Sequence, residues 1–233
     1  MTRQKNIDKL KRMTGVGVFA ALAYLSMIVL RIPDIGGFLT MDLKDVIITI
    51  AAMFFGPSAA IFISVTVPFL EFLTISGTGV YGLIMNILSS LAFSFVASLI
   101  YKYKKTLGGA VIGLLSAVFA VTAVMMAANL LITPYYMNMP TEAVAQLIPK
   151  LLLPFNLTKA LFNAALVLIL YKPLTSAMRR TDFFGKKKTN DIAENKSQTI
   201  ILLVVGIAIA LASILVILLV WGGKISFFDV FKE

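Results

Sequence analysis

Three polar side chains interrupt the apolar stretch at residues 151–166, which reads LLLPFNLTKALFNAAL. Asn156, Lys159 and Asn163 are spaced i, i+3 and i+7, so they share one face of a helix. A cation in mid-membrane costs about 2.5–3.5 kcal/mol on insertion scales, and each amide needs hydrogen-bond partners in hydrocarbon. The stripe therefore indicates a polar ligand pocket. The alternative is that Lys159, about 7 Å inside the helix start, extends outward to interfacial water.

The side chains of such a pocket favour a flat heteroaromatic ligand. An asparagine offers a carbonyl and an NH₂ group, which complement the alternating N–H and C=O groups of a cyclic imide, and a lysine donates to a carbonyl or ring nitrogen. Several aromatic residues could stack on a planar ring, namely Phe155, Phe162, Phe72, Tyr135 and Tyr136. The sequence has no cysteine and no histidine, which excludes metal sites and catalytic pairs that depend on them. We expect neither a catalytic residue nor a metal site, and no enzymatic activity.

The composition predicts an all-α membrane protein. Hydrophobic residues make up 59% of the 233 residues, charged residues make up 14%, and the mean hydropathy is +0.94. A helix needs about 20 apolar residues to cross a hydrocarbon core of about 30 Å. The hydropathy pattern predicts seven spans, at residues 13–30, 43–56, 58–73, 81–100, 108–132, 152–171 and 199–221.

The distribution of polar residues divides the chain into four parts. Residues 1–178 are predicted to form a six-helix substrate-binding domain, and residues 179–198 form a basic cytoplasmic linker. An additional transmembrane helix follows at 199–221, and a short extracellular tail at 222–233. Fifteen of the 21 lysines and arginines fall on the side of the amino terminus, which the positive-inside rule places in the cytoplasm. The basic runs are read as this topology signal, with some attraction to anionic lipid, and no nucleic-acid partner is expected.

Local signals add expectations about the ends of the spans. Asp42 and Asp45 are predicted to act as an N-cap and an N3 acid at the start of the 43–56 span. Residues 31–37 are rich in helix breakers and predict a loop, and Pro134 is expected to stop the helix before it. Glu71 either reaches interfacial water or faces a polar cavity.

Five stretches of the chain resemble the S components of energy-coupling factor (ECF) vitamin transporters, in particular the riboflavin-specific group. They read FLTMDLKDV at 38–46, FFGP at 54–57, GTGVYGLIMN at 77–86, NLLITPYYM at 129–137 and PFNLTKA at 154–160. The resemblance covers residues 1–180 approximately and implies a six-helix bundle that binds riboflavin from the extracellular side of the plasma membrane. The 199–221 span has no counterpart in that pattern.

The resemblance also implies roles for individual residues. Asn129, Asn156 and Lys159 would hydrogen-bond the isoalloxazine edge, with Tyr135 among the aromatic residues near the ring. The loop with Leu39, Thr40, Met41 and Asp42 would cover the ligand, and Glu71 and Asn86 would approach its ribityl chain. A small-residue face, formed by Gly17, Ala20 and Ala21, would dock on the transmembrane coupling subunit EcfT, and the ATPase subunits EcfA and EcfA′ would hydrolyse ATP.

Other interpretations of the sequence stay open. The ligand could be FMN or another vitamin, since Arg31 and Lys150 near the pocket mouth would tolerate a phosphate. An intramembrane enzyme that uses Glu71 is disfavoured, because no second carboxylate has helical spacing to it and no histidine exists to share proton transfer. A membrane assembly partner, whose function resides in its small-residue face, is a third possibility.

Overall fold

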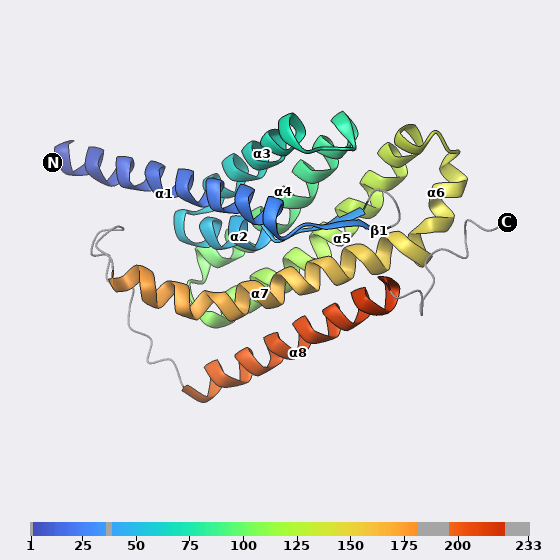
Figure 1. Cartoon of the computed structure of the whole chain (residues 1–233). Helices are drawn as coiled ribbons and strands as arrows, with labels where there is room; N and C mark the ends of the chain where they lie inside the picture. The colour runs from blue at the N-terminus through green and yellow to red at the C-terminus, as the bar shows by residue number, and fades with distance from the viewer. Residues whose placement is uncertain (1, 36–38, 181–195, 222–233) are drawn as a thin grey trace.

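The computed structural model describes residues 2–35, 39–180 and 196–221 of the chain (Figure 1). Most of the predicted basic linker and the whole predicted tail at 222–233 lie outside these residues. The described elements are α1 (Thr2–Val29), β1 (Ile32–Ile35), β2 (Leu39–Met41), α2 (Lys44–Phe55), α3 (Pro57–Thr74), α4 (Gly79–Tyr103), α5 (Leu107–Met137), α6 (Thr141–Leu147), the π-helical turn η1 (Ile148–Leu152), α7 (Leu153–Arg180) and α8 (Lys196–Trp221).

The helical membrane fold predicted from the composition is confirmed. Five helical segments among the described residues are long and apolar enough to cross a membrane: Asn6–Val29, Pro57–Thr74, Gly79–Tyr103, Leu107–Met137 and Thr141–Tyr171. The other two predicted spans also form helices. α2 has 12 residues, and α8 has 26, with an apolar segment at Leu203–Ile217.

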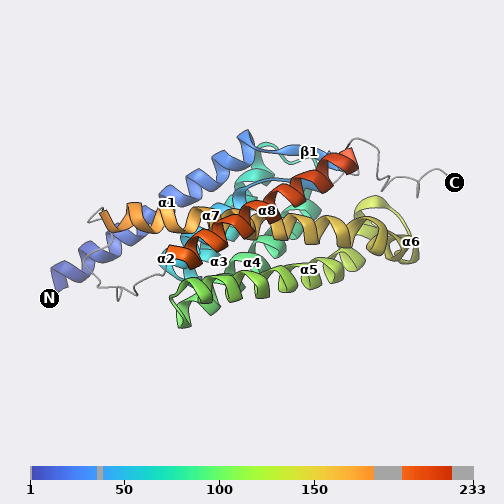
Figure 2. The same cartoon turned by 90° about the horizontal axis from the view of Figure 1, so that it is seen from below.

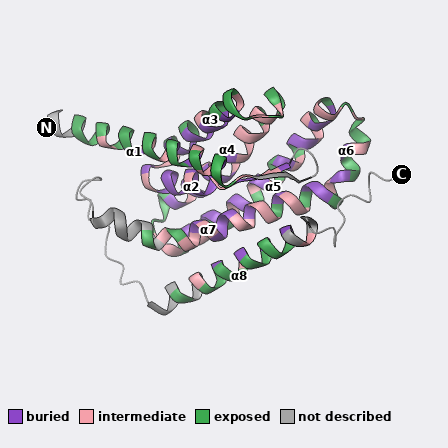
Figure 3. Cartoon of the chain, in the orientation of Figure 1, coloured by how far each residue is buried: buried purple, intermediate pink, exposed green. Residues whose placement is uncertain are grey.

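The centre of the bundle is α2, because it contacts α1, α3, α4 and α7. Ten of its 12 residues are buried, whereas α1 and α8 turn large exposed faces outward (Figure 3). α4 and α5 form a close hairpin around Gly113, where an added Cβ would lie only 2.8 Å from the carbonyl oxygen of Ala97. The main apolar core lies between α2, α4, α5 and α7, which fixes these four helices relative to one another.

Two segments differ from the sequence prediction. The predicted loop after α1 contains a small antiparallel hairpin, in which Ile32 pairs with Met41 and Ile35 with Leu39. Pro134 does not stop α5: the helix continues to Met137 and ends at Asn138, which has a φ of 52°. A proline removes one N–H from the helix, but ending the helix in hydrocarbon would expose several backbone groups at once.

The additional helix α8 packs antiparallel along α7, as Figures 1 and 2 both show. The helices approach closely at Gly206, where an added Cβ would lie 3.2 Å from Cγ1 of Ile169 and 3.5 Å from the carbonyl oxygen of Ala165. Among the α8 residues whose burial is described, the buried ones recur on one face, at Gly206, Ala210, Ser213 and Ile217. Small residues on this face allow the two helices to approach closely, and the opposite face of α8 is left apolar and exposed.

Candidate functional site

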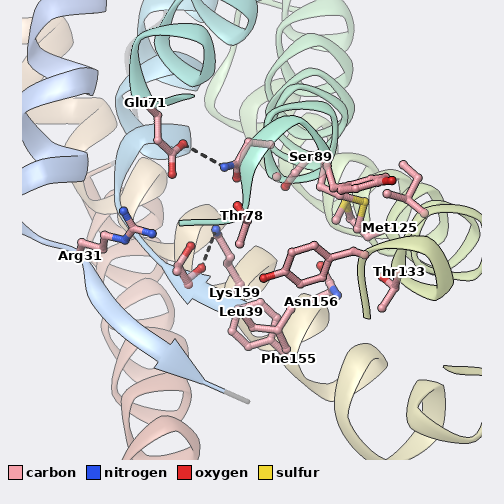
Figure 4. Close-up of a pocket in the computed structure, with 17 residues that line it drawn as sticks. Arg31, Leu39, Glu71, Thr78, Ser89, Met125, Thr133, Phe155, Asn156 and Lys159 are labelled. Carbon is pink, nitrogen blue, oxygen red and sulfur yellow. Dashed lines mark hydrogen bonds between the residues drawn. The ribbon is translucent and has the colours of Figure 1, made fainter. Parts of the chain in front are cut away.

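A cavity opens beside Arg31, which follows α1, and Figure 4 shows the side chains that line it. Its volume is about 90 Å³, against about 10–15 Å³ for a site that holds a single water molecule. Its walls come from the β1–β2 hairpin and from α3, α4, α5 and α7. The lining residues are Arg31, Leu39, Thr40, Glu71, Thr78, Tyr81, Gly82, Met85, Asn86, Ser89, Met125, Ile132, Thr133, Tyr136, Phe155, Asn156 and Lys159.

Lys159 joins α7 to the segment that leads from the hairpin into α2. Its Nζ lies 3.1 Å from Oδ2 of Asp42 and donates to the carbonyl oxygen of Thr40, also at 3.1 Å. Nζ of Lys44 lies 2.8 Å from the same Asp42 oxygen. Burial alone would raise the pKa of the Asp42 carboxyl, but the two ammonium groups outweigh it and hold that pKa well below its usual range. Lys159 is therefore held by the protein rather than extended to water.

A second chain of hydrogen bonds continues from Lys44 to α3. Nζ of Lys44 donates to Oδ1 of Asn86 at 3.3 Å, and Nδ2 of Asn86 donates to Oε2 of Glu71 at 2.9 Å. Glu71 is only 4% exposed and lines the cavity, so of its two predicted environments the structure has the polar cavity. Lys44 was absent from the predicted site, although its position between two acids at the start of an otherwise apolar helix is a signal for a buried ion pair.

The predicted capping pattern at the start of α2 is wrong in register. Leu43 occupies the N-cap position and makes no side-chain cap. Oδ1 of Asp42 instead accepts a hydrogen bond from the backbone N–H of Lys44 at 3.1 Å, and the Asp45 carboxylate accepts one from the hydroxyl of Ser90 on α4. Both acids bind to neighbours in the bundle. Asp42 bonds to the backbone at the start of α2 and, with Lys44 and Lys159, forms an ion cluster.

Aromatic and amide groups meet the polar cluster from the other side of the cavity. Phe155 and Tyr136 line it, and the ring of Tyr136 lies edge-on to Tyr81 with centroids 6.1 Å apart. Nδ2 of Asn156 donates to the carbonyl oxygen of Leu152 at 2.7 Å, which orients the amide at the cavity wall. Tyr135 is 76% exposed, so the structure places it away from the cavity.

Three other predicted residues do not line the cavity. Asn129 is fully buried in α5, where its Nδ2 donates to the carbonyl oxygen of Met125 at 2.7 Å and its Oδ1 accepts from the hydroxyl of Thr133 at 2.9 Å. Met41 and Asp42 are 2% exposed and lie behind the wall. Asn129 and Asp42 therefore contact residues that line the cavity, namely Met125, Thr133 and Lys159.

The predicted docking face on α1 is divided between two sides of the helix. Gly17 and Ala21 are exposed, and a Cβ added at Gly17 would meet no atom within 4 Å. Ala20 is 8% exposed and packs inside the bundle, in a cluster with residues of α2 and α3. Gly17 and Ala21 thus form the part of this set that a partner helix could reach.

Comparisons with known proteins agree with the helical fold. A family model described as the substrate-specific component of ECF transporters matches residues 11–175. The riboflavin transporter RibU of Staphylococcus aureus (strain TCH60) is 29% identical over 185 residues, which cover 76% of this chain and 97% of that protein.

A solved structure, reported as "Structure and mechanism of the S component of a bacterial ECF transporter", superposes with a TM-score of 0.64 and 26% identity, and covers 74% of this chain and 99% of the solved one. The matched family region ends within α7, so α8 lies beyond it. The sequence resemblance and the helical architecture are confirmed, and the chain belongs to the family of substrate-specific components of ECF transporters.

Proposed function

We propose that this S component binds riboflavin and carries it into the cell. The observation that supports this proposal most directly is the cavity itself, which combines hydrogen-bonding groups on α7 with the aromatic rings of Tyr136 and Phe155. The similarity to a protein named riboflavin transporter supports the same ligand.

The hydrogen-bonding capacity of α7 suits the imide edge of the isoalloxazine ring. An ammonium group has three donors, and Lys159 uses two of them on Asp42 and Thr40, which leaves one for a ligand carbonyl. Asn156 uses one N–H on Leu152, which leaves its other N–H and its carbonyl oxygen for the ligand. On the α3–α4 side, Glu71, Asn86, Ser89 and Thr78 supply polar groups for the hydroxyls of a ribityl chain.

The proposal extends to topology and partners. The amino terminus of the chain lies in the cytoplasm and the cavity opens to the outside, as the positive-inside rule favours. The exposed face with Gly17 and Ala21 docks on the transmembrane coupling subunit, and ATP is hydrolysed by the ATPase subunits of the complex.

The test is whether flavin accompanies the full chain through purification in detergent. The expected product is yellow, releases riboflavin on denaturation, and quenches flavin fluorescence on titration after the bound ligand is removed. A colourless protein that causes no quenching at micromolar flavin would refute the ligand assignment.

FMN is a second candidate because Arg31 lines the cavity, whereas Lys150 is exposed and does not. We expect FMN to bind at least about tenfold more weakly than riboflavin, since the Glu71 carboxylate lines the same cavity and would oppose a phosphate. Competition between the two flavins for the ligand-free protein measures this ratio. Equal or tighter binding of FMN would make Arg31 a phosphate contact and reverse the assignment.

The binding unit is proposed to be residues 1–178, with α8 as an accessory helix. A chain truncated after Asn190 is expected to keep its riboflavin Kd within about twofold, because none of the described lining residues comes from α8 and distant changes usually cost under about 0.5 kcal/mol. Fluorescence titration of the truncated and full chains measures the difference. The full chain with Gly206→Leu, which would separate α8 from α7, is the matched control, and a large loss of affinity in both would contradict the assignment.

A further inference from the structure

A second, smaller cavity lies directly beside the first. Its volume is about 10 Å³, and it shares Ser89, Asn156 and Lys159 with the larger cavity. Asp45 and Asn163 complete its polar wall. Asn163 is four residues beyond Lys159 on α7, so the two side chains lie on one helical face and the small cavity continues the stripe inward.

Asn163 has an unsatisfied polar atom in this cavity wall. The residue is 2% exposed, and its Oδ1 has no hydrogen-bond partner among the described residues. A buried acceptor left unpaired costs about 1–3 kcal/mol. Such an atom on a ligand-binding helix indicates that a small donor belongs beside it.

Asp45 presents a second acceptor to the same cavity. Its side chain is 2% exposed and receives the hydroxyl of Ser90, but within the described ranges no ammonium or guanidinium lies at salt-bridge distance from it. The nearby ammonium groups of Lys44 and Lys159 are both bound to Asp42. Donor groups of Ser89, Asn156 and Lys159 also line the cavity, but a group with two donors would bind both of these acceptors at once.

We propose that one water molecule occupies this cavity, donates to Oδ1 of Asn163 and to the Asp45 carboxylate, and forms the floor below the flavin. A cavity of this size is at the lower limit for one water and is far too small for part of a ring. Asn163 is then a positioning residue. It holds the water, and the water keeps polar the wall where Asn156 and Lys159 face the ligand cavity. This role rests on the proposed binding of riboflavin.

The variant Asn163→Leu separates this role from a structural one. Leucine has a similar shape and removes the acceptor together with the water that pairs with it, so the thermal stability of the ligand-free full chain should stay nearly equal. The affinity for riboflavin should fall by about 3- to 10-fold, the equivalent of one hydrogen bond. A variant that loses stability and keeps its affinity, or one in which neither changes, would overturn the proposal.

Ser64→Ala is the matched control. Its Oγ is also buried and without a partner among the described residues, but Ser64 lies on α3 and lines neither cavity. Its removal should leave riboflavin affinity unchanged. An equal loss of affinity in the two variants would assign the effect of Asn163→Leu to the bundle as a whole and overturn the positioning role.

A crystal structure of the full chain decides the water site without reference to flavin. Density within hydrogen-bond distance of both Asn163 and Asp45 is expected, and a site without density would overturn the proposal even if Asn163→Leu fails to fold. An anomalous peak at this site after soaking in rubidium would show that a monovalent cation occupies it, and would overturn the assignment to water. If the wild-type chain binds no riboflavin, the proposed function falls, while this density still tests the water.

Discussion

The variant Asp42→Ala should lower the free energy of unfolding by about 3–5 kcal/mol, because it leaves two ammonium groups without their carboxylate. The Asp42 and Lys44 side chains are 2% and 1% exposed, so water cannot replace the lost partner of Lys44, whereas Lys159 is 11% exposed and lines the cavity. Thermal unfolding of the purified protein in detergent, followed by the loss of helical circular dichroism, measures the effect.

The pair Lys44 and Asp42 provides its own control. In the double variant Asp42→Ala/Lys44→Met the buried charge is removed together with its partner, and much of the lost stability should return. The comparison belongs at neutral pH, because Asp42 has a lowered pKa when folded. Its contribution is fully present above the unfolded value of about 3.9 and is lost as the pH falls through the folded value. If Asp42→Ala were as stable as the wild type, the ion cluster would not be what holds the hairpin against the bundle.

The variant Lys159→Met should weaken riboflavin binding by about 10- to 150-fold, which corresponds to the loss of one hydrogen bond from a charged donor. Stability should change less than in Asp42→Ala, since Lys44 still neutralises Asp42 at 2.8 Å. Fluorescence titration of ligand-free protein gives the Kd of each variant. An analogue of riboflavin without the carbonyl that Lys159 contacts should bind the wild type and the variant almost equally.

Lys150→Met is the matched control for this lysine. Lys150 is near the same end of the bundle, but it is exposed and lines no part of the cavity, so its loss should leave the Kd unchanged. Similar losses in the two variants would point to a general effect of surface charge on flavin binding. Unchanged affinity in Lys159→Met would remove the residue from the site while leaving the fold assignment intact.

The sequence predicted the helices well because the membrane imposes one rule on every span. Apolar length and helical spacing were enough to place Asn156 and Lys159 on one face of α7 and near a cavity. The β1–β2 hairpin and the Lys44–Asp42 pair were not predicted. Both depend on contacts between segments that a pattern along one element does not contain.

Tyr135 and Tyr136 show another limit of predicting the site from the sequence. With α5 expected to end before Pro134, Tyr135 and Tyr136 are equivalent candidates for stacking on the ligand ring. Because the helix continues, they are about 100° apart around its axis, and only Tyr136 lines the cavity. Asn129 shows the same effect: its amide pairs within α5, and a motif match alone could not reveal that.

The short length of α2 bears on the depth of the binding site in the membrane. Twelve residues span about 18 Å, roughly three fifths of a hydrocarbon core, and the turn at Gly56 joins α2 directly to α3. In the proposed topology, with the turn at Gly56 at the cytoplasmic surface, the start of α2 would lie below the outer surface of the hydrocarbon layer, and there Asp42 and Lys44 meet Lys159. The hairpin and α6 occupy the remaining depth above it. A vitamin bound to Lys159 would be enclosed by protein on its sides. Its rate of dissociation would depend on how often the hairpin and α6 move apart.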